Sequence, residues 1–240
     1  MEITERMRPY TGWPRRRKAC RRGSVLRRAG RFGQAEFARY FAVNLVVRQI
    51  TGGWIMWEMN WLIRSGGLSP WLLKPVPMPL YNMVMTLAAI PFRMVVLAPM
   101  LVALALWRPD VVFVPELGTF LLFVVSVALA WLLSWLIQLL FGILAFWMEQ
   151  TMGLFAAYFA VWSLLSGYFL PLELLPSGVE KVSRFLPFHP SMGAPVDLLL
   201  GTDMHPGRTL LLQLAWIGAA YGLVRLLWAR GIKRYGAYGA

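Results

Sequence analysis

The sequence has few of the residue types on which catalytic and metal sites depend. Its 240 residues include one cysteine, Cys20, and two histidines, His189 and His205. A single cysteine excludes an intramolecular disulfide and gives no signal of a redox or metal site. The two histidines share a loop with Asp203, but their spacing matches no metal-binding template, so we expect them to be solvated.

A phosphate-binding loop is also absent. No G-x-x-x-x-G-K-[ST] motif occurs, and Gly66-Gly67 is too short to cradle a phosphate and more typical of a turn. Paired carboxylates or histidines are missing from the apolar segments. We therefore expect a chain that is not an enzyme, binds no cofactor or metal, and cannot hydrolyse ATP by itself.

Charged residues are scarce as well, at 15% of the chain where a soluble domain has about 25%. The longest uncharged run covers 117–148, between Glu116 and Glu149. About 20 apolar residues cross a bilayer. A large soluble helical core would need charged faces, which these segments lack. The composition therefore predicts an all-α integral membrane protein.

Five apolar segments are long enough to be expected as transmembrane helices. They cover 37–59, 80–107, 118–147, 152–170 and 209–228. The first is the weakest, because Arg48 near its middle costs about 2.5–3.5 kcal/mol on insertion scales. Arg93 lies inside the second, which Pro91 and Pro99 should kink. Arg48 could face a polar translocation path, but we favour pairing inside the bundle or snorkelling.

The later segments contain a few polar side chains and one predicted break. Ser126, Ser134 and Gln138 are expected to form helix–helix hydrogen bonds. The fourth segment ends in a stretch that favours a broken or re-entrant hairpin, since backbone that leaves the helix survives at membrane depth only under cover of protein or water. Its marker residues are Ser166, Gly167, Pro171, Glu173 and Pro176. A polar loop is expected over 177–207.

Basic residues suggest an orientation. Arg230, Lys233 and Arg234 near the end have no acidic neighbour, which places the C-terminus in the cytoplasm. Counting back through five spans places 64–79 inside and 178–206 outside. The first 34 residues conflict with this count, because they hold eleven of the 24 Lys and Arg yet fall outside. We interpret 1–35 as a disordered or non-native leader, in preference to a nucleic-acid-binding arm or a lipid-touching tail, and 36–240 as the membrane domain.

The block between the first two segments reads RSGGLSPWLLKPVPMP, over 64–79. Ser69 as cap and Pro70 as first helical residue predict a short helix, which the following prolines end. Leu68, Trp71, Leu72 and Leu73 give it an apolar face. It either lies on lipid or transmits motion from a cytoplasmic partner. The residues concerned are Arg64, Leu68, Ser69, Pro70, Trp71, Leu72, Leu73, Lys74 and Pro75.

Several stretches resemble one known family. They are VRQITGGWIMWEMNWLIRSGGLSPWLLKPVPMPLYN (47–82), SGYFLPLELLP (166–176), FLPFHP (185–190), DLLLG (197–201) and the tail 226–240. Together they resemble the permease subunits of type 2 ABC exporters, in the six-span branch that includes multidrug and viologen exporters.

The resemblance implies two paired permease subunits, each bound to a cytoplasmic ATPase subunit that carries ATP and Mg, in the bacterial cytoplasmic (inner) membrane. The five segments would be spans two to six, with 64–79 as coupling helix, 166–176 as outer gate, and the usual first span missing. Aromatic spans suit a hydrophobic small molecule or lipid-like substrate, but suit lipid contact equally well. The alternative is a non-transporting anchor or regulatory subunit. We expect no nucleic-acid partner.

Overall fold

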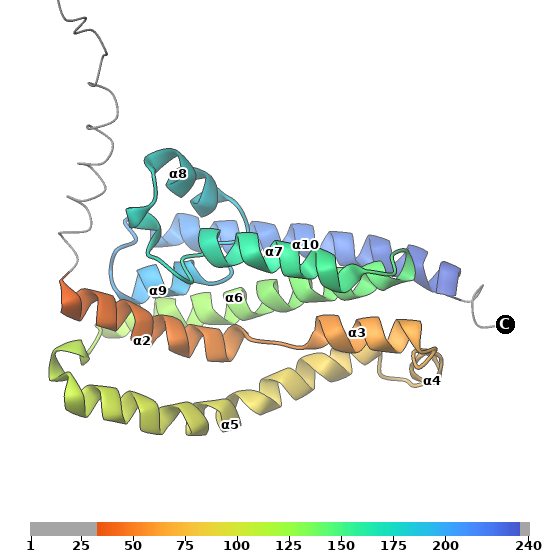
Figure 1. The fold of residues 1–240 in the computed structure, drawn as a ribbon, viewed down its shortest axis with the longest axis horizontal. Helices are drawn as coiled ribbons and strands as arrows, with labels where there is room; N and C mark the ends of the chain where they lie inside the picture. The colour runs from red at the N-terminus through yellow and green to blue at the C-terminus, as the bar shows by residue number, and fades with distance from the viewer. Residues whose placement is uncertain (1–32, 236–240) are drawn as a thin grey trace, which may run out of the picture.

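The computed structural model describes residues 33–235, which are mostly helical and contain no strand (Figure 1). This confirms the all-α class, whereas the predicted leader lies almost wholly outside the described residues. The α-helices are α2 (Gln34–Thr51), α3 (Ile55–Arg64), α4 (Ser69–Leu72), α5 (Met78–Trp107), α6 (Leu117–Ile143), α7 (Thr151–Leu165), α8 (Ser177–Phe185), α9 (Gly193–Leu199) and α10 (Pro206–Tyr235). Three short 3₁₀ turns join them: η1 (Pro109–Val111), η2 (Leu144–Phe146) and η3 (Leu172–Leu174).

Helix α6 is the axis of the bundle. It packs against α2, α3, α9 and α10, and Figure 1 shows it running through the middle of the molecule. One buried cluster joins it to α3 and α10 around Met59, Leu139 and Ile143. A second joins it to α2 and α9 around Val47 and Met192. The longest uncharged run of the sequence is therefore also the most enclosed helix.

Glycine permits the close contact between α3 and α6. A Cβ atom at Gly142 would lie 2.7 Å from Met59 Cβ and 3.3 Å from the Met56 carbonyl oxygen. Gly118, in the first turn of the same helix, has open space around the corresponding position. Small residues at such crossings let helix backbones approach closely in a membrane, where van der Waals packing holds helices together.

Three helices are long and apolar enough to cross a membrane: α5, α10 and α6 extended by η2. The predicted count of five spans is not confirmed. The segment expected as one helix over 37–59 is interrupted, because α2 ends at Thr51 and α3 begins at Ile55. Helix α7 has 15 residues, about 22 Å at 1.5 Å each, whereas the apolar core of a bilayer is about 30 Å thick.

Helix α5 lies at the edge of the bundle. It runs without interruption through Pro91 and Pro99, and Figure 1 shows it bending part-way along, as internal prolines favour. Near its start, Asn82 accepts a hydrogen bond from Trp135 of α6 at 3.1 Å and donates one to Glu58 of α3. Farther along, side chains such as Phe92 and Val95 are exposed, as lipid contact requires.

The expectation of a polar loop over 177–207 is wrong. Two helices lie there, and the chain leading into α9 is enclosed by the bundle, with Met192, Ala194 and Val196 fully buried. Four prolines in this part of the sequence favoured a loop. The short apolar run that forms α9 is covered by α2 and α6, which no local pattern reveals.

The glycine contact gives a stability prediction. Gly142→Ala should lower the free energy of unfolding by about 1–3 kcal/mol, because the added methyl group meets a Cβ atom and not the flexible end of a side chain. Thermal or SDS-induced unfolding in detergent micelles would measure this change. Gly118→Ala is the matched control: it should stabilise by up to about 1 kcal/mol, as alanine replaces glycine in a helix without a clash. Equal effects at both positions would contradict the proposed packing.

Candidate functional site

The interruption between α2 and α3 opens onto a cavity of about 500 Å³. The walls come from the end of α2, the start of α3, the middle of α6 and one face of α7. They are mainly aromatic and aliphatic, with a few polar groups. The lining residues are Arg48, Thr51, Gly52, Gly53, Trp57, Ser134, Ile137, Gln138, Met152, Phe155, Ala156, Tyr158, Phe159 and Trp162. We call it the aromatic cavity.

Arg93 of α5 stabilises the end of α2. The last carbonyl groups of a helix have no partner within it and carry a partial negative charge. The Arg93 guanidinium donates to the carbonyl oxygens of Gly52 at 2.5 Å and Gln49 at 3.3 Å. A cation from a neighbouring helix therefore satisfies the backbone at the point where α2 stops.

Arg48 has a different environment, although it lies in the last turn of the same helix. Its guanidinium stacks over the Tyr168 ring, 4.9 Å from the ring centroid. Among residues 33–235 it has no hydrogen-bond or ion-pair partner, and its side chain is exposed at the mouth of the aromatic cavity. The two arginines of the predicted spans therefore have different partners: Arg93 is hydrogen-bonded to the backbone, whereas Arg48 has no such partner in the described part of the chain.

The polar groups of α6 differ in the same way. Ser126 donates to Gln213 of α10 at 3.1 Å, and Ser134 donates to the Ser191 carbonyl at 3.2 Å, as expected of interhelical hydrogen bonds. Gln138 does not follow that expectation. Its Oε1 atom is buried without a hydrogen-bond partner in the described part of the chain, and its amide faces Gly53 at the break.

The predicted hairpin segment begins where α7 ends, and its backbone is not α-helical. Gly167 adopts a φ of +89°, a conformation that favours glycine. The Tyr40 hydroxyl donates to the Gly167 carbonyl, and Asn44 Nδ2 donates to the Tyr168 carbonyl at 2.9 Å. Ser166 is buried beneath this turn. The segment is therefore broken as predicted and attached to α2, while a re-entrant path through the membrane is not confirmed.

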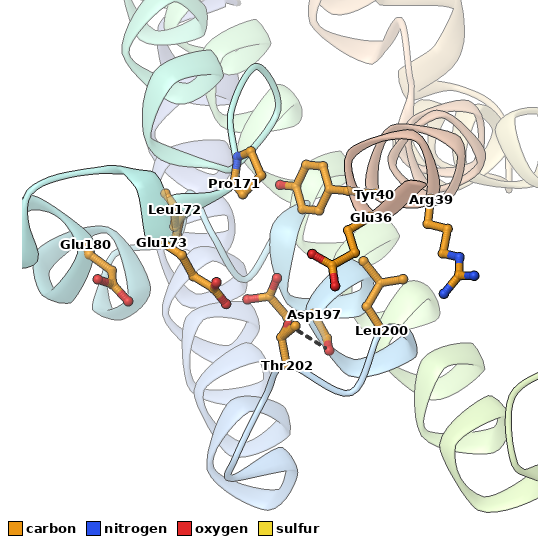
Figure 2. Close-up of a pocket in the computed structure, with 10 residues that line it drawn as sticks. All are labelled: Glu36, Arg39, Tyr40, Pro171, Leu172, Glu173, Glu180, Asp197, Leu200 and Thr202. Atoms are coloured by element: carbon orange, nitrogen blue, oxygen red, sulfur yellow. Dashed lines mark hydrogen bonds between the residues drawn. The ribbon is translucent and has the colours of Figure 1, made fainter. Parts of the chain in front are cut away.

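Figure 2 shows a second cavity, of about 710 Å³, beyond this turn. Pro171 and Glu173 of the predicted hairpin line it, together with acidic side chains from three other helices: Glu36, Glu180 and Asp197. Pro176 immediately precedes α8 and is exposed. Two of the five predicted hairpin residues, Pro171 and Glu173, thus line an acidic cavity at one end of the bundle.

Asp197 of α9 joins this helix to α8 and to the chain that precedes α9. It accepts from Arg184 at 3.1 Å and lies 3.0 Å from His189 Nε2. Burial would lower the pKa of Arg184, but the nearby Asp197 and Glu180 carboxylates raise it overall, so this arginine stays charged.

His189 and His205 have different environments. His205 is exposed, as expected. His189 is only 4% exposed, so the expectation of a solvated histidine is wrong for it, because the unforeseen α9 encloses it. Within the described ranges, no cluster of three or more potential metal ligands occurs.

The coupling segment forms one turn of helix, α4. Leu68 occupies the cap position that Ser69 was expected to fill, while Ser69 Oγ lies 3.1 Å from the Tyr235 hydroxyl of α10. The expected common apolar face is divided: Leu68 is fully buried in the core, whereas Leu73 is 90% exposed. The Lys74 Nζ atom lies over the Trp71 ring, 3.7 Å from the ring centroid. Arg64, Pro70, Leu72 and Pro75 are exposed too.

The different pairing of the two arginines gives a testable contrast. Arg93→Met should lower the free energy of unfolding by about 1.5–3 kcal/mol, because it removes charge-assisted hydrogen bonds to half-buried carbonyls. Arg48→Met is the matched control and should lower the free energy of unfolding by less, about 0.5–1 kcal/mol, since it removes only the contact with the Tyr168 ring. Unfolding midpoints in detergent measure both. A larger loss at Arg48 would contradict the assigned roles.

Comparison with known proteins agrees with this membrane architecture. A family model described as ABC-2 family transporter protein matches residues 33–239. A search of curated proteins gives no match. The family match covers the entire described helical bundle, including α5, α6 and α10 with their spanning length. The chain therefore belongs to the ABC-2 family of transporter proteins.

Proposed function

We propose that this chain is the permease subunit of an exporter that moves a hydrophobic small molecule or lipid-like substrate out of the cytoplasm. The observation that carries the proposal is the aromatic cavity, which lies among apolar helices at a break in one of them. Interrupted helices at membrane depth are typical of transporter substrate sites. Its volume is within the range of small-molecule pockets.

Energy for transport would come from a partner. ABC-2 family membrane proteins work with ABC ATP-binding subunits in general. The surface around α4 suits such a partner, because Leu72 and Leu73 are exposed between the cations Arg64 and Lys74. A patch with exposed leucines in its centre and charges at its rim resembles protein–protein interfaces. A second permease subunit would complete the transport unit.

The contacts support the orientation inferred from charge. The hydrogen bond between Ser69 and Tyr235 holds the coupling segment beside the end of α10, so both belong on one side of the membrane. Figure 1 shows α4 and the end of α10 at one end of the bundle and α8 and α9 toward the other. With the basic C-terminus in the cytoplasm, the acidic cavity would open to the exterior and its Pro171–Pro176 rim would be the outer gate.

The coupling role is tested by the double variant Leu72→Asp with Leu73→Asp. Two carboxylates on the docking surface should reduce co-purification of the cognate ATP-binding subunit by about tenfold or more, because they would be buried without partners. ATP-dependent uptake of a hydrophobic dye into inside-out vesicles should fall in parallel. Leu68 is unsuitable for this test, since it lies in the core and its replacement would disturb folding.

Val114→Asp is the matched control, because Val114 is 93% exposed in the connection between α5 and α6. It should leave both measurements unchanged. Normal partner binding and uptake in the Leu72/Leu73 variant would exclude the coupling role. Partner binding without any dye uptake by the unaltered protein would favour the non-transporting subunit instead.

A further inference from the structure

The aromatic cavity has one charged group in its lining, and that group is a cation. This residue, Arg48, is exposed and separates the aromatic cavity from a neighbouring cavity of about 340 Å³, which it lines together with Tyr168. No Asp or Glu is among the described residues that line the aromatic cavity. The other polar side chains are neutral: Thr51, Ser134, Gln138 and the hydroxyl of Tyr158. Four acidic residues line the separate cavity of Figure 2 instead, namely Glu36, Glu173, Glu180 and Asp197, with Arg39 as the one basic residue among its described lining. The two cavities therefore have opposite electrostatic character.

Within residues 33–235, no acidic group neutralises the Arg48 charge. The guanidinium rests on the Tyr168 ring, a contact that leaves its N–H donors without acceptors in the described chain. An arginine in an apolar bundle is costly unless it is paired or reaches water. Arg93, one helix away, satisfies this requirement with two carbonyl groups. For Arg48 the corresponding acceptor is missing, and an anion placed in the cavity would supply it.

The walls suit the apolar part of such an anion. Trp57 and Phe155 meet edge to face with ring centroids 5.1 Å apart, and Phe159 and Trp162 are stacked at 5.3 Å. These rings come from α3, which begins after the break, and from α7. Gln138 adds an amide oxygen with no partner in the described chain, which can accept a hydrogen bond from a ligand.

Aromatic walls alone would also attract organic cations, through the negative faces of the rings. Arg48 reverses that preference. In a medium of low dielectric constant, repulsion between two cations at contact distance exceeds the attraction of one aromatic face. Since the lining residues within 33–235 include no carboxylate to offset the repulsion, a cationic ligand gains little there.

We propose that the aromatic cavity binds amphipathic anions, with the acidic head on the Arg48 guanidinium and the apolar body between α3 and α7, and that it excludes organic cations. The claim that such anions are transported rests on the proposed permease function. The claim that the cavity binds them does not depend on that function. The anion is either a small organic acid or an anionic lipid, which share this chemistry.

The test uses the purified full chain in neutral detergent and a pair of fluorescent probes. Dansylaminohexanoate and its trimethylammonium analogue share body and length and differ in the charge of the head. Energy transfer from tryptophan to dansyl reports binding to the protein, whose twelve tryptophans include Trp57 and Trp162 of the cavity wall, and the Arg48 variants assign the signal to the cavity. The saturable part of the carboxylate signal should correspond to at least about tenfold tighter binding than that of the ammonium probe, as a charge-assisted hydrogen bond confers.

Arg48→Gln should weaken carboxylate binding about tenfold and leave the ammonium probe unchanged or tighter. Arg48→Lys keeps the charge and should retain most of the binding, which shows that loss in Arg48→Gln is not a folding defect. Arg225→Gln is the matched control, since Arg225 is an exposed arginine of α10 outside this cavity. Equal binding of both probes, or no effect of Arg48→Gln on carboxylate binding, would overturn the proposal.

Competition separates the two sources of anion. Displacement of the probe by octanoate at concentrations below its micelle formation indicates a small-acid site, whereas displacement only by phosphatidylglycerol indicates a lipid site; both agree with the proposal. Displacement by neither, with the signal scaling only with detergent, would refute it. Binding needs no ATPase partner, so failure of dye uptake with intact anion selectivity would refute the permease function alone.

Discussion

The structure depends on one constraint: backbone that leaves the helix inside an apolar bundle must find hydrogen-bond donors. Three interruptions meet this need with side chains from neighbouring helices. Arg93 of α5 serves the carbonyls after α2, Tyr40 and Asn44 of α2 serve those after α7, and Gln213 of α10 serves the Pro190 carbonyl before α9 at 2.9 Å. Each donor also fixes the position of its own helix. The breaks therefore do not loosen the bundle but hold its helices together.

The same constraint explains why the aromatic cavity lies where it does. Because α2 ends at Thr51 and α3 begins at Ile55, no helical side chains fill the space beside Gly52 and Gly53. Gln138 approaches from α6 without a bonding partner in the described chain, and Arg48 is left at the rim. A continuous helix would have packed against α6 and closed this space. The cavity is thus a direct consequence of the interruption that Arg93 makes tolerable.

Hydropathy was sufficient to predict the helices that cross the bundle unbroken. Helices α5, α6 and α10 begin and end within a few residues of the expected segments or extend beyond them, since long uncharged runs admit few alternatives. The break at Gly52-Gly53 was visible in the sequence only as two glycines. Its stability depends on Arg93, about 40 residues away. Both arginines were recognised as unusual, but only the position of α5 decides which of them is paired. The burial of α9 and His189 is likewise a tertiary effect.

Helix α3 connects the two parts that the proposed function requires. Its first turns place Trp57 in the wall of the aromatic cavity, and beyond its last residue Leu68 anchors the coupling segment in the core. The helix is ten residues long and packs tightly against Gly142 of α6. A displacement at α4 would therefore reach the cavity through a rigid element. Tyr40 and Asn44 hold α2 to the turn after α7, and Arg93 holds the Gly52 carbonyl, so α2 would stay in place during such a displacement.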